Sequence, residues 1–181
     1  MGKAHAPIPS KLFVGMLSQD IGLFEHCVDR LISVYGPVDL RSEILPWDHS
    51  DYYRDEMGPG LRRIFFFFTT PIDPGDLAAI KHYSIQLEQE LTRTDISGTH
   101  RAINLDPGYI TEAKVVLATT KDFPHRVYIG RHIYAESTLH YSKTKGSYLA
   151  VEHTYPDFRI QYSRDLFNKV RELLRTNLHG K

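Results

Sequence analysis

The chain has 181 residues, with 22 basic and 22 acidic side chains, so its formal charge is zero when histidine is neutral. Hydrophobic residues make up 41% of it and charged residues 24%, which is typical of a globular protein. The even charge balance argues against a strongly basic nucleic-acid-binding protein, so we do not expect nucleic acid as a partner. The chain has no apolar run of the length, about 18 residues, that crosses a membrane, and its first ten residues lack the apolar core of a signal peptide. We therefore expect a cytoplasmic protein with no membrane partner.

The first half of the chain predicts the order strand, helix, strand, strand, helix, strand. The strands are expected at 11–17, 38–45, 62–69 and 101–105. Apolar residues at steps of three and four, Cys27 among them, predict the first helix, which Gly36 and Pro37 end. Asp73 is expected to cap the second helix, with Pro74 in its first turn. This order is that of a ferredoxin-like split unit.

The residues 65–68 are four consecutive phenylalanines. Neighbouring residues of a strand point to opposite faces, so this run places aromatic rings on both faces. We expect the strand to be central and buried. Cys27, the single cysteine, cannot form an internal disulfide and is interpreted as a small buried hydrophobe.

The second half of the chain extends this core. We predict a turn at Asp106-Pro107-Gly108 and a short helix over 112–118, capped by Thr111. The other predicted elements are strands at 126–129, 132–141 and 147–154, a hairpin turn at 143–146 and a last helix after Ser163. The fold class is therefore α+β, with a ferredoxin-like βαββαβ core extended by an antiparallel hairpin and a C-terminal helix. Residues 1–10 are expected to form a flexible tail, and 11–181 a single domain.

Standard catalytic motifs are missing from the sequence. It contains no GxxxxGK[ST] phosphate loop, GxGxxG, GxSxG or HExxH motif, and no EF-hand loop. Their absence argues against P-loop nucleotide hydrolysis and dinucleotide-dependent oxidoreduction, although it leaves less common sites open.

The loop over 46–61 is the first of four polar segments that could carry chemistry. Its Asp48, His49, Asp51 and Glu56 offer oxygen and nitrogen donors that could hold a divalent metal, the one cofactor that the residues suggest. The alternative is a solvated loop with surface charge.

Asn104 and Asp106 form the second segment, at the end of a predicted strand and before a Pro-Gly turn. Functional groups often lie at such loop positions. The alternative is that the two side chains satisfy the amides of the turn.

The third segment contains Thr120, Lys121, His125 and Arg126 around a turn constrained by Pro124. Two permanent cations and a hydroxyl suit a phosphate or carboxylate group, and His125 could transfer a proton near neutral pH. The alternative is that Lys121 and its neighbours are the solvated charges of a turn.

The strand over 132–141 is the fourth segment. Its period of two predicts an apolar inner face and a polar outer face that carries both Glu136 and His140, with Thr138 between them. These two side chains could border one pocket, or they could be part of an exposed polar face.

Four stretches of the sequence, KLFVGML, DYYRDEMG, INLDPGYI and KVVLATTKDFPHRVYIGRHIYAESTL, together resemble the bacterial family called domain of unknown function 4416. The resemblance runs from Lys11 to about Leu174. It implies a single-domain protein with no established activity, and it transfers no catalytic residue. The description "GTP-binding protein", carried by some members, has no support here because the sequence lacks a phosphate loop.

We expect a small enzyme or binder that acts on an anionic, nucleotide- or phosphate-bearing small molecule. His125 would transfer protons with Asp106 and Glu136 as acid–base groups. The ligand-binding candidates are Asn104, Thr120, Lys121, Arg126 and His140. The four segments should then border one concave site. The alternative is a non-catalytic interaction module, either a homodimer that uses an exposed sheet face or an RNA-contacting protein.

Overall fold

The computed structural model describes residues 2–48, 53–95 and 98–180. Its strands are β1 (Ser10–Ser18), β2 (Val38–Arg41), β3 (Leu45–Pro46), β4 (Arg62–Ile72), β5 (Thr92–Asp95), β6 (Gly98–Arg101), β7 (Ile103–Ile110), β8 (Lys114–Thr119), β9 (Val127–Gly130), β10 (Ile133–Ser142) and β11 (Ser147–Ala150). Its helices are α1 (Gly22–Tyr35), α2 (Arg54–Met57), α3 (Leu77–Glu90), α4 (Pro156–Arg159) and α5 (Gln161–His179), and a 3-10 turn (Pro74–Asp76) precedes α3. The protein is thus a mixed α+β protein, as predicted.

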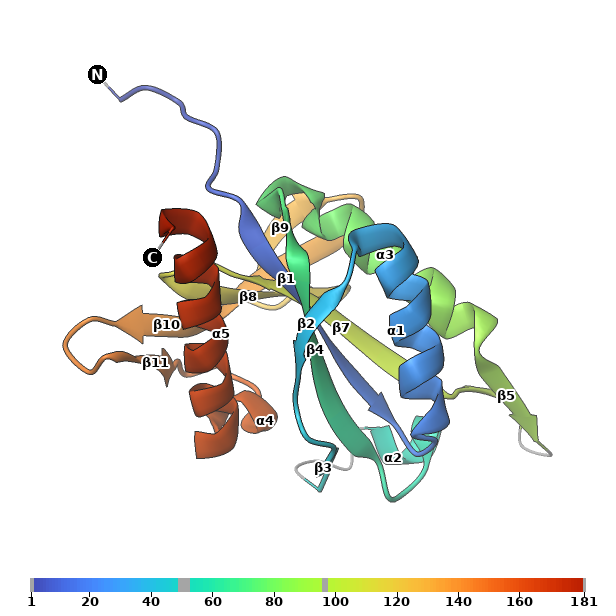
Figure 1. Ribbon diagram of the computed structural model, residues 1–181. Helices are drawn as coiled ribbons and strands as arrows, with labels where there is room; N and C mark the ends of the chain where they lie inside the picture. The colour runs from blue at the N-terminus through green and yellow to red at the C-terminus, as the bar shows by residue number, and fades with distance from the viewer. Residues whose placement is uncertain (1, 49–52, 96–97, 181) are drawn as a thin grey trace.

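Within these described ranges, nine strands form one antiparallel sheet in which β11, β10, β8, β7, β1, β4 and β2 follow one another. β3 pairs with β4 and β9 pairs with β10, while β5 and β6 form a separate hairpin. Figure 1 shows α1 and α3 on one face of the sheet and α5 on the other. The sheet has more strands than predicted because residues 114–119 form β8 where a helix was expected, and because the predicted strand over 38–45 is divided into β2 and β3.

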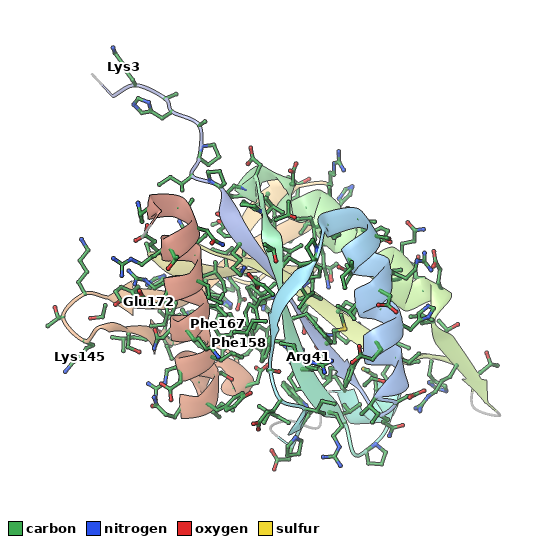
Figure 2. The ribbon with its side chains drawn as sticks, viewed as in Figure 1. Lys3, Arg41, Lys145, Phe158, Phe167 and Glu172 are labelled. Carbon is green, nitrogen blue, oxygen red and sulfur yellow. The ribbon has the colours of Figure 1, made fainter. Side chains whose placement is uncertain are left out.

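The central strand β4 carries the phenylalanines onto both faces, as predicted. Phe66 and Phe68 pack in the cluster under α1 and α3, and Phe65 and Phe67 pack in the cluster under α5. All four are at most 2% exposed. The second cluster is closed by Phe158 and Phe167, whose rings lie 5.3 Å apart between the C-terminal helices and the sheet (Figure 2). Both faces are therefore covered, as expected for strands that are apolar throughout.

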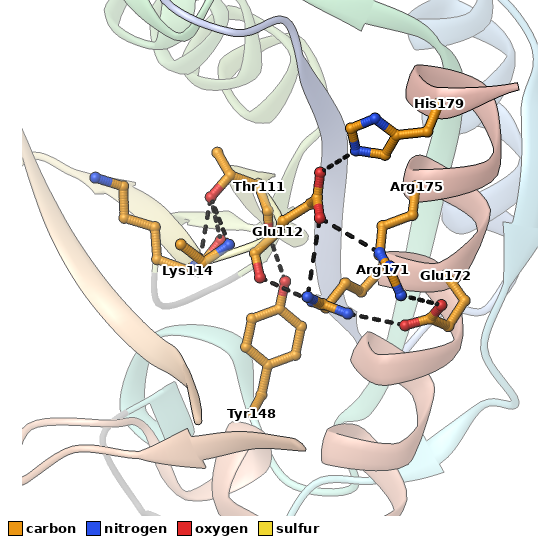
Figure 3. A network of polar contacts seen from close by, with 9 residues as sticks. Thr111, Glu112, Lys114, Tyr148, Arg171, Glu172, Arg175 and His179 are labelled. Carbon is orange, nitrogen blue, oxygen red and sulfur yellow. Dashed lines mark hydrogen bonds and ion pairs between the residues drawn. The ribbon is translucent and has the colours of Figure 1, made fainter. Parts of the chain in front are cut away.

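The C-terminal half of α5 is tied to the turn between β7 and β8 through Glu112 (Figure 3). One carboxylate oxygen of Glu112 lies 2.6 Å from His179 Nε2, and the other lies 3.3 Å from Arg175 Nε. Arg171 Nε donates to the Glu112 carbonyl oxygen at 2.7 Å. The hydrogen bond from His179 and the charges of both arginines lower the pKa of Glu112. These contacts tie the C-terminal half of α5 to the turn between β7 and β8.

The predicted turn at Asp106-Pro107-Gly108 is wrong, because β7 continues through it. Gly108 is needed for close packing instead: a Cβ atom there would meet the Val116 carbonyl oxygen and the Phe13 ring. The sequence signal was a Pro-Gly pair, which usually marks a turn but also occurs where another backbone approaches closely.

The predicted helix over 112–118 is also wrong, because those residues enter β8. The side chains of β8 are buried on both faces, with Leu117 on the α5 side and Val116 on the α3 side. In a short strand that is covered on both faces, apolar and polar residues do not alternate. Its sequence therefore cannot be distinguished from that of a buried helical turn. Thr111 does accept hydrogen bonds from the amides of Ala113 and Lys114, but these bonds close a hairpin turn.

Glu136 and His140 do not share a face of β10, which corrects the fourth segment. A β-bulge inserts Thr138 between the pairs that Ser137 and Leu139 make with β8. The extra residue reverses the alternation, so that Glu136 is buried on the α5 side and His140 is exposed on the other face.

The sequence also did not predict α2, α4 or the β5–β6 hairpin, and several predicted boundaries differ. The predicted strand over 38–45 is divided into β2 and β3, the predicted strand over 147–154 ends at Ala150, and α5 begins two residues before Ser163. β1 begins at Ser10, and residues 2–9 before it form no helix or strand. Cys27 is fully buried, as predicted. Asp73 accepts a hydrogen bond from Gly75 N, but it caps the 3-10 turn that precedes α3, and α3 itself begins at Leu77.

Candidate functional site

A cavity of about 660 Å³ lies where β7 and β8 separate. The two strands are paired over Gly108–Ile110 of β7, and beyond that point β7 stays with β1 while β8 stays with β10. The lining comes from both strands, from α3, and from the segments 119–126 and 153–157. A break in the sheet thus brings distant parts of the chain to one hollow.

Two side chains of α3 satisfy the open edge of β7. Leu105 N donates to Glu88 Oε1 at 2.6 Å, and Leu105 O accepts from Lys81 Nζ at 2.7 Å. These backbone groups point away from β1, and so does the nitrogen of Pro107, because alternate residues of a strand bond in the same direction. Pro107 has no proton to offer β8, so the ladder ends there. Burial raises the pKa of Glu88, and Lys81, the Leu105 amide and Arg101 only partly oppose it.

Arg63 lies at the first of two charged centres in the cavity. Its Nη1 donates to Asp106 Oδ2 at 2.8 Å, and its Nε lies 3.0 Å from Asp157 Oδ2. The guanidinium also stacks over Phe65, with its carbon 4.9 Å from the ring centroid. Burial disfavours the charged form, but Asp157 and Asp106 outweigh it and raise the pKa of Arg63.

Asp106 continues this centre towards the surface. Its Oδ2 also accepts a hydrogen bond from Asn104 Nδ2 at 2.8 Å, and Asn104 Oδ1 accepts from Arg101 Nη1 at 2.9 Å. Arg101 in turn donates to Glu56 at 2.7 Å. Burial alone would raise the pKa of Asp106, but Arg63, Lys81 and the two hydrogen bonds outweigh it, and this pKa is lowered. Asp106 is therefore charged at neutral pH.

Glu136 forms the second charged centre, on β10. Its Oε2 accepts a hydrogen bond from Arg126 Nε at 2.7 Å and lies 3.1 Å from His125 Nε2. Its Oε1 is buried and has no hydrogen-bond partner. Arg126 also donates to the Lys121 carbonyl oxygen at 3.1 Å and to the Tyr155 hydroxyl at 2.8 Å. Arg126 thus positions the three groups around it.

Tyr155 lies between the two centres, since the charges of Arg126, Glu136 and Asp106 all act on it. Burial is the main reason that its pKa is raised, so the hydroxyl keeps its proton at neutral pH. Because the oxygen accepts from Arg126, that proton is available for a ligand. The site therefore offers acceptors at Glu136 and Asp106 and a neutral donor between them.

A model of the family described as Domain of unknown function (DUF4416) matches residues 8–174. The chain belongs to this family. No curated protein and no solved structure matches the chain.

Several of the predicted site residues of this DUF4416 chain meet at the cavity. Those that line it are Asn104, Asp106, Thr120, Lys121, His125, Arg126 and Glu136. They come from three of the four polar segments, which supports the expectation of one concave site for those three. The loop over 46–61 contributes Trp47 and Tyr53 to the lining but none of its predicted metal ligands.

The predicted metal set does not form one site in the described residues. Asp48 is exposed and borders a different, smaller hollow, and Glu56 is exposed and paired with Arg101. His49 and Asp51 lie outside the described residues. In the part of the chain that the structure describes, no three His, Cys, Asp or Glu side chains gather in a way that could hold a metal ion. His140 lies away from the cavity lining.

Among the described residues, no helix has both the length and the apolar character that crossing a membrane requires.

Important side chains of the cavity were missed from the sequence: Arg63, Lys81, Glu88, Arg101, His153, Tyr155 and Asp157. One signal was present for Arg63, because it alternates with the apolar residues Phe65 and Phe67 on one face of its strand. A charged residue in phase with a buried face indicates a paired, functional or structural charge. No local signal marked the residues of α3 and 153–157.

Proposed function

We propose that the protein binds an anionic small molecule, of a phosphate- or nucleotide-bearing kind, in the cavity between β7 and β8. The observation that supports this most is the meeting of three polar segments at one hollow of about 660 Å³. That volume falls within the range of about 300–1,000 Å³ typical of small-molecule pockets. A single surface turn or solvated loop would not account for this convergence.

The charges of the lining favour a negative ligand. Among the described lining residues, five are Lys or Arg and four are Asp or Glu, and two histidines add positive charge when protonated. Thr120 and Lys121 at the end of β8 and the Tyr155 hydroxyl are the donors that a phosphate or carboxylate group would use. Arg126 supports them from behind through its bonds to the Lys121 carbonyl and to Tyr155.

His125 would be the proton-transfer group if the ligand reacts. Its Nε2 faces Glu136, which fixes the ring and leaves Nδ1 as the second titratable nitrogen. Glu136 would act through His125 as a positioning residue in that case.

Binding is tested by calorimetry and thermal unfolding with orthophosphate, ribose 5-phosphate and nucleoside monophosphates. A ligand at one hundred times its dissociation constant should raise the free energy of unfolding by about 2.7 kcal/mol. Lys121→Ala should weaken binding about tenfold, as expected for loss of a charge-assisted hydrogen bond. Lys145→Ala is the matched control, because Lys145 lies at the tip of the β10–β11 hairpin (Figure 2). Equal effects of the two substitutions, or no binding by any of these compounds, would contradict the proposal.

The fold suggests how the cavity arose. We propose that β1, α1, β2, β4, α3 and β7 form a ferredoxin-like core, with β8 to β11, α4 and α5 added at its β7 edge. The neighbours β7, β1, β4 and β2 in the sheet are compatible with that assignment. The cavity then lies at the junction between core and addition.

Self-association is a second candidate function, favoured by one observation. The edge strand β9 exposes Val127 and Tyr128 by 67% and 55%, and Ile129 is 36% exposed. A second copy could pair with this edge in antiparallel fashion. Sedimentation equilibrium measures this self-association directly, and Tyr128→Lys should weaken it. A wild type that is monomeric at all concentrations would exclude self-association. RNA contact has less support, because both sheet faces are covered and Phe65–Phe68 are buried.

A further inference from the structure

Only one of the two carboxylate oxygens of Glu136 makes polar contacts. The side chain is 3% exposed and lines the cavity. Its Oε2 carries both polar contacts, to Arg126 and to His125, whereas its buried Oε1 has no hydrogen-bond partner. A buried acceptor without a partner costs free energy, and native proteins usually satisfy such a group. Glu136 lines the cavity, so a molecule bound there could supply a partner for Oε1 once the side chains that cover this atom shift.

Flat rings lie next to this carboxyl group. His125 and His153 are stacked with centroids 4.0 Å apart and planes inclined by 11°. Phe123 is also stacked with His125, with centroids 6.2 Å apart and planes inclined by 20°. All three side chains line the cavity. A planar molecule that stacks on this group of rings therefore lies in the same cavity as Glu136.

We propose that Glu136 and the stacked rings of Phe123, His125 and His153 form a subsite for a nucleobase that carries an exocyclic amino group. This inference rests on the proposed function, because it makes the anionic ligand a nucleotide. The amino group donates to Oε1, the acceptor that Arg126 and His125 leave unused. The base stacks on the imidazoles, as bases do on aromatic side chains in many nucleic-acid-binding proteins. The phosphate then lies towards Lys121 and Tyr155.

An amino-bearing base fits these features better than a sugar or a simple phosphate. A carboxylate oxygen repels phosphate oxygens and accepts only from a donor. A sugar hydroxyl could donate, but a planar base contacts the rings with the whole face of its π system. Carboxylates commonly accept from the amino groups of bases in protein–nucleic acid contacts.

The test compares nucleotides that differ by the amino group alone. AMP, CMP and GMP are titrated beside purine riboside monophosphate, zebularine monophosphate and inosine monophosphate, which lack it. In the wild type at least one amino-bearing nucleotide should bind about tenfold more tightly than the matched nucleotide without the amino group. Glu136→Gln should abolish or reverse that preference. Since Arg126 only donates, the Gln amide would turn its oxygen to Arg126 and its NH₂ group to the cavity.

His153→Ala provides a second variant that should fold normally, because His153 is exposed. Loss of one stacking surface should weaken nucleotides about tenfold and leave ribose 5-phosphate unchanged. If none of the three pairs shows a preference, or if the preference survives in Glu136→Gln, the inference is overturned.

Nucleosides without phosphate separate this inference from the proposed function. If they bind with the same amino preference and phosphate adds nothing, the subsite stands and the anion proposal fails. If phosphate compounds bind without regard to the base, only the subsite fails. Absence of binding by any compound would overturn both.

Discussion

Arg63 of β4 donates a hydrogen bond to Asp106 of β7 at 2.8 Å, although β1 lies between these two strands. Gly15 of β1 makes the contact possible. It is paired with Asp106 on one side and with Phe65 on the other, and the guanidinium lies over it. A Cβ atom at Gly15 would lie 3.0 Å from the guanidinium carbon and from the Phe65 ring. Because Gly15 has no side chain, the Arg63 guanidinium can cross over β1 and reach Asp106.

We predict that Gly15→Ala displaces Arg63 and lowers the free energy of unfolding by about 1–3 kcal/mol, as overpacking of a dense site does. In an Arg63→Met background the cost should be smaller, because the fixed guanidinium is gone. Urea denaturation of the two single variants and the double variant measures this coupling. A neutral or stabilising Gly15→Ala would show instead that the guanidinium moves aside without loss.

Asp106→Asn tests the charge of the same centre through pH. Since the pKa of Asp106 is lowered in the folded protein, its charged form stabilises the fold above the unfolded value of 3.8, and this contribution is lost as pH falls through the folded pKa. We predict that Asp106→Asn is less stable than the wild type by about 1.5–3 kcal/mol at pH 7. The difference should narrow below pH 3.8. Denaturation curves between neutral and acid pH measure it, and a difference that stays constant with pH would refute the assignment.

Cys27 should be inert in the folded protein. Its side chain is fully buried, and burial is the main cause that raises its pKa to about 12. Both effects suppress the thiolate that reacts with alkylating reagents. We predict that native protein reacts at least about a hundredfold more slowly than the urea-unfolded chain at pH 8. Rapid labelling without denaturant would mean that α1 opens readily from the sheet.

The sequence predicted those parts of the fold whose signals are local. The stripe that includes Cys27 and the buried run 65–68 each depend on a few neighbouring residues, and both predictions are confirmed. Asp73 does act as a cap, but of the 3-10 turn before α3. The failures came where tertiary packing decides. Gly108 is glycine because Val116 and Phe13 approach it, and no local pattern records those neighbours.

The site was predictable only in part for the same reason. His125 and Arg126 stand out as titratable and cationic groups around a proline, and both line the cavity. Asp157 and Lys81 lie in segments with ordinary helical composition, and only the break between β7 and β8 brings them there. The bulge at Thr138 likewise reverses the face of His140 and carries no sequence signal.

The turn between β9 and β10 gives the last prediction. Arg131 and His132 have φ angles of 54° and 61°, which lie in the left-handed region that residues other than Gly and Asn seldom adopt. Ile133 is paired with Gly130 across them, so they form a two-residue hairpin turn with the backbone of type I′, for which Asn-Gly is the preferred sequence.

Replacing both residues, Arg131→Asn with His132→Gly, should raise the free energy of unfolding by about 1–2 kcal/mol. Each residue held in this region costs about 1–3 kcal/mol of backbone strain, which Gly removes at position 132 and Asn removes only in part at position 131. The two exposed side chains can be removed safely, since the contacts of this turn to His82 and Tyr128 use the Arg131 carbonyl and the His132 amide. Thermal unfolding should show a midpoint higher by about 2–8 °C, given about 2–4 °C per kcal/mol for a chain of this size. Gly146→Ala, at a φ of 63° in the β10–β11 turn, is the reciprocal control and should lower the midpoint. If the double substitution leaves the midpoint unchanged or lowers it, the side chains of Arg131 and His132 stabilise the turn by more than their backbone strain costs.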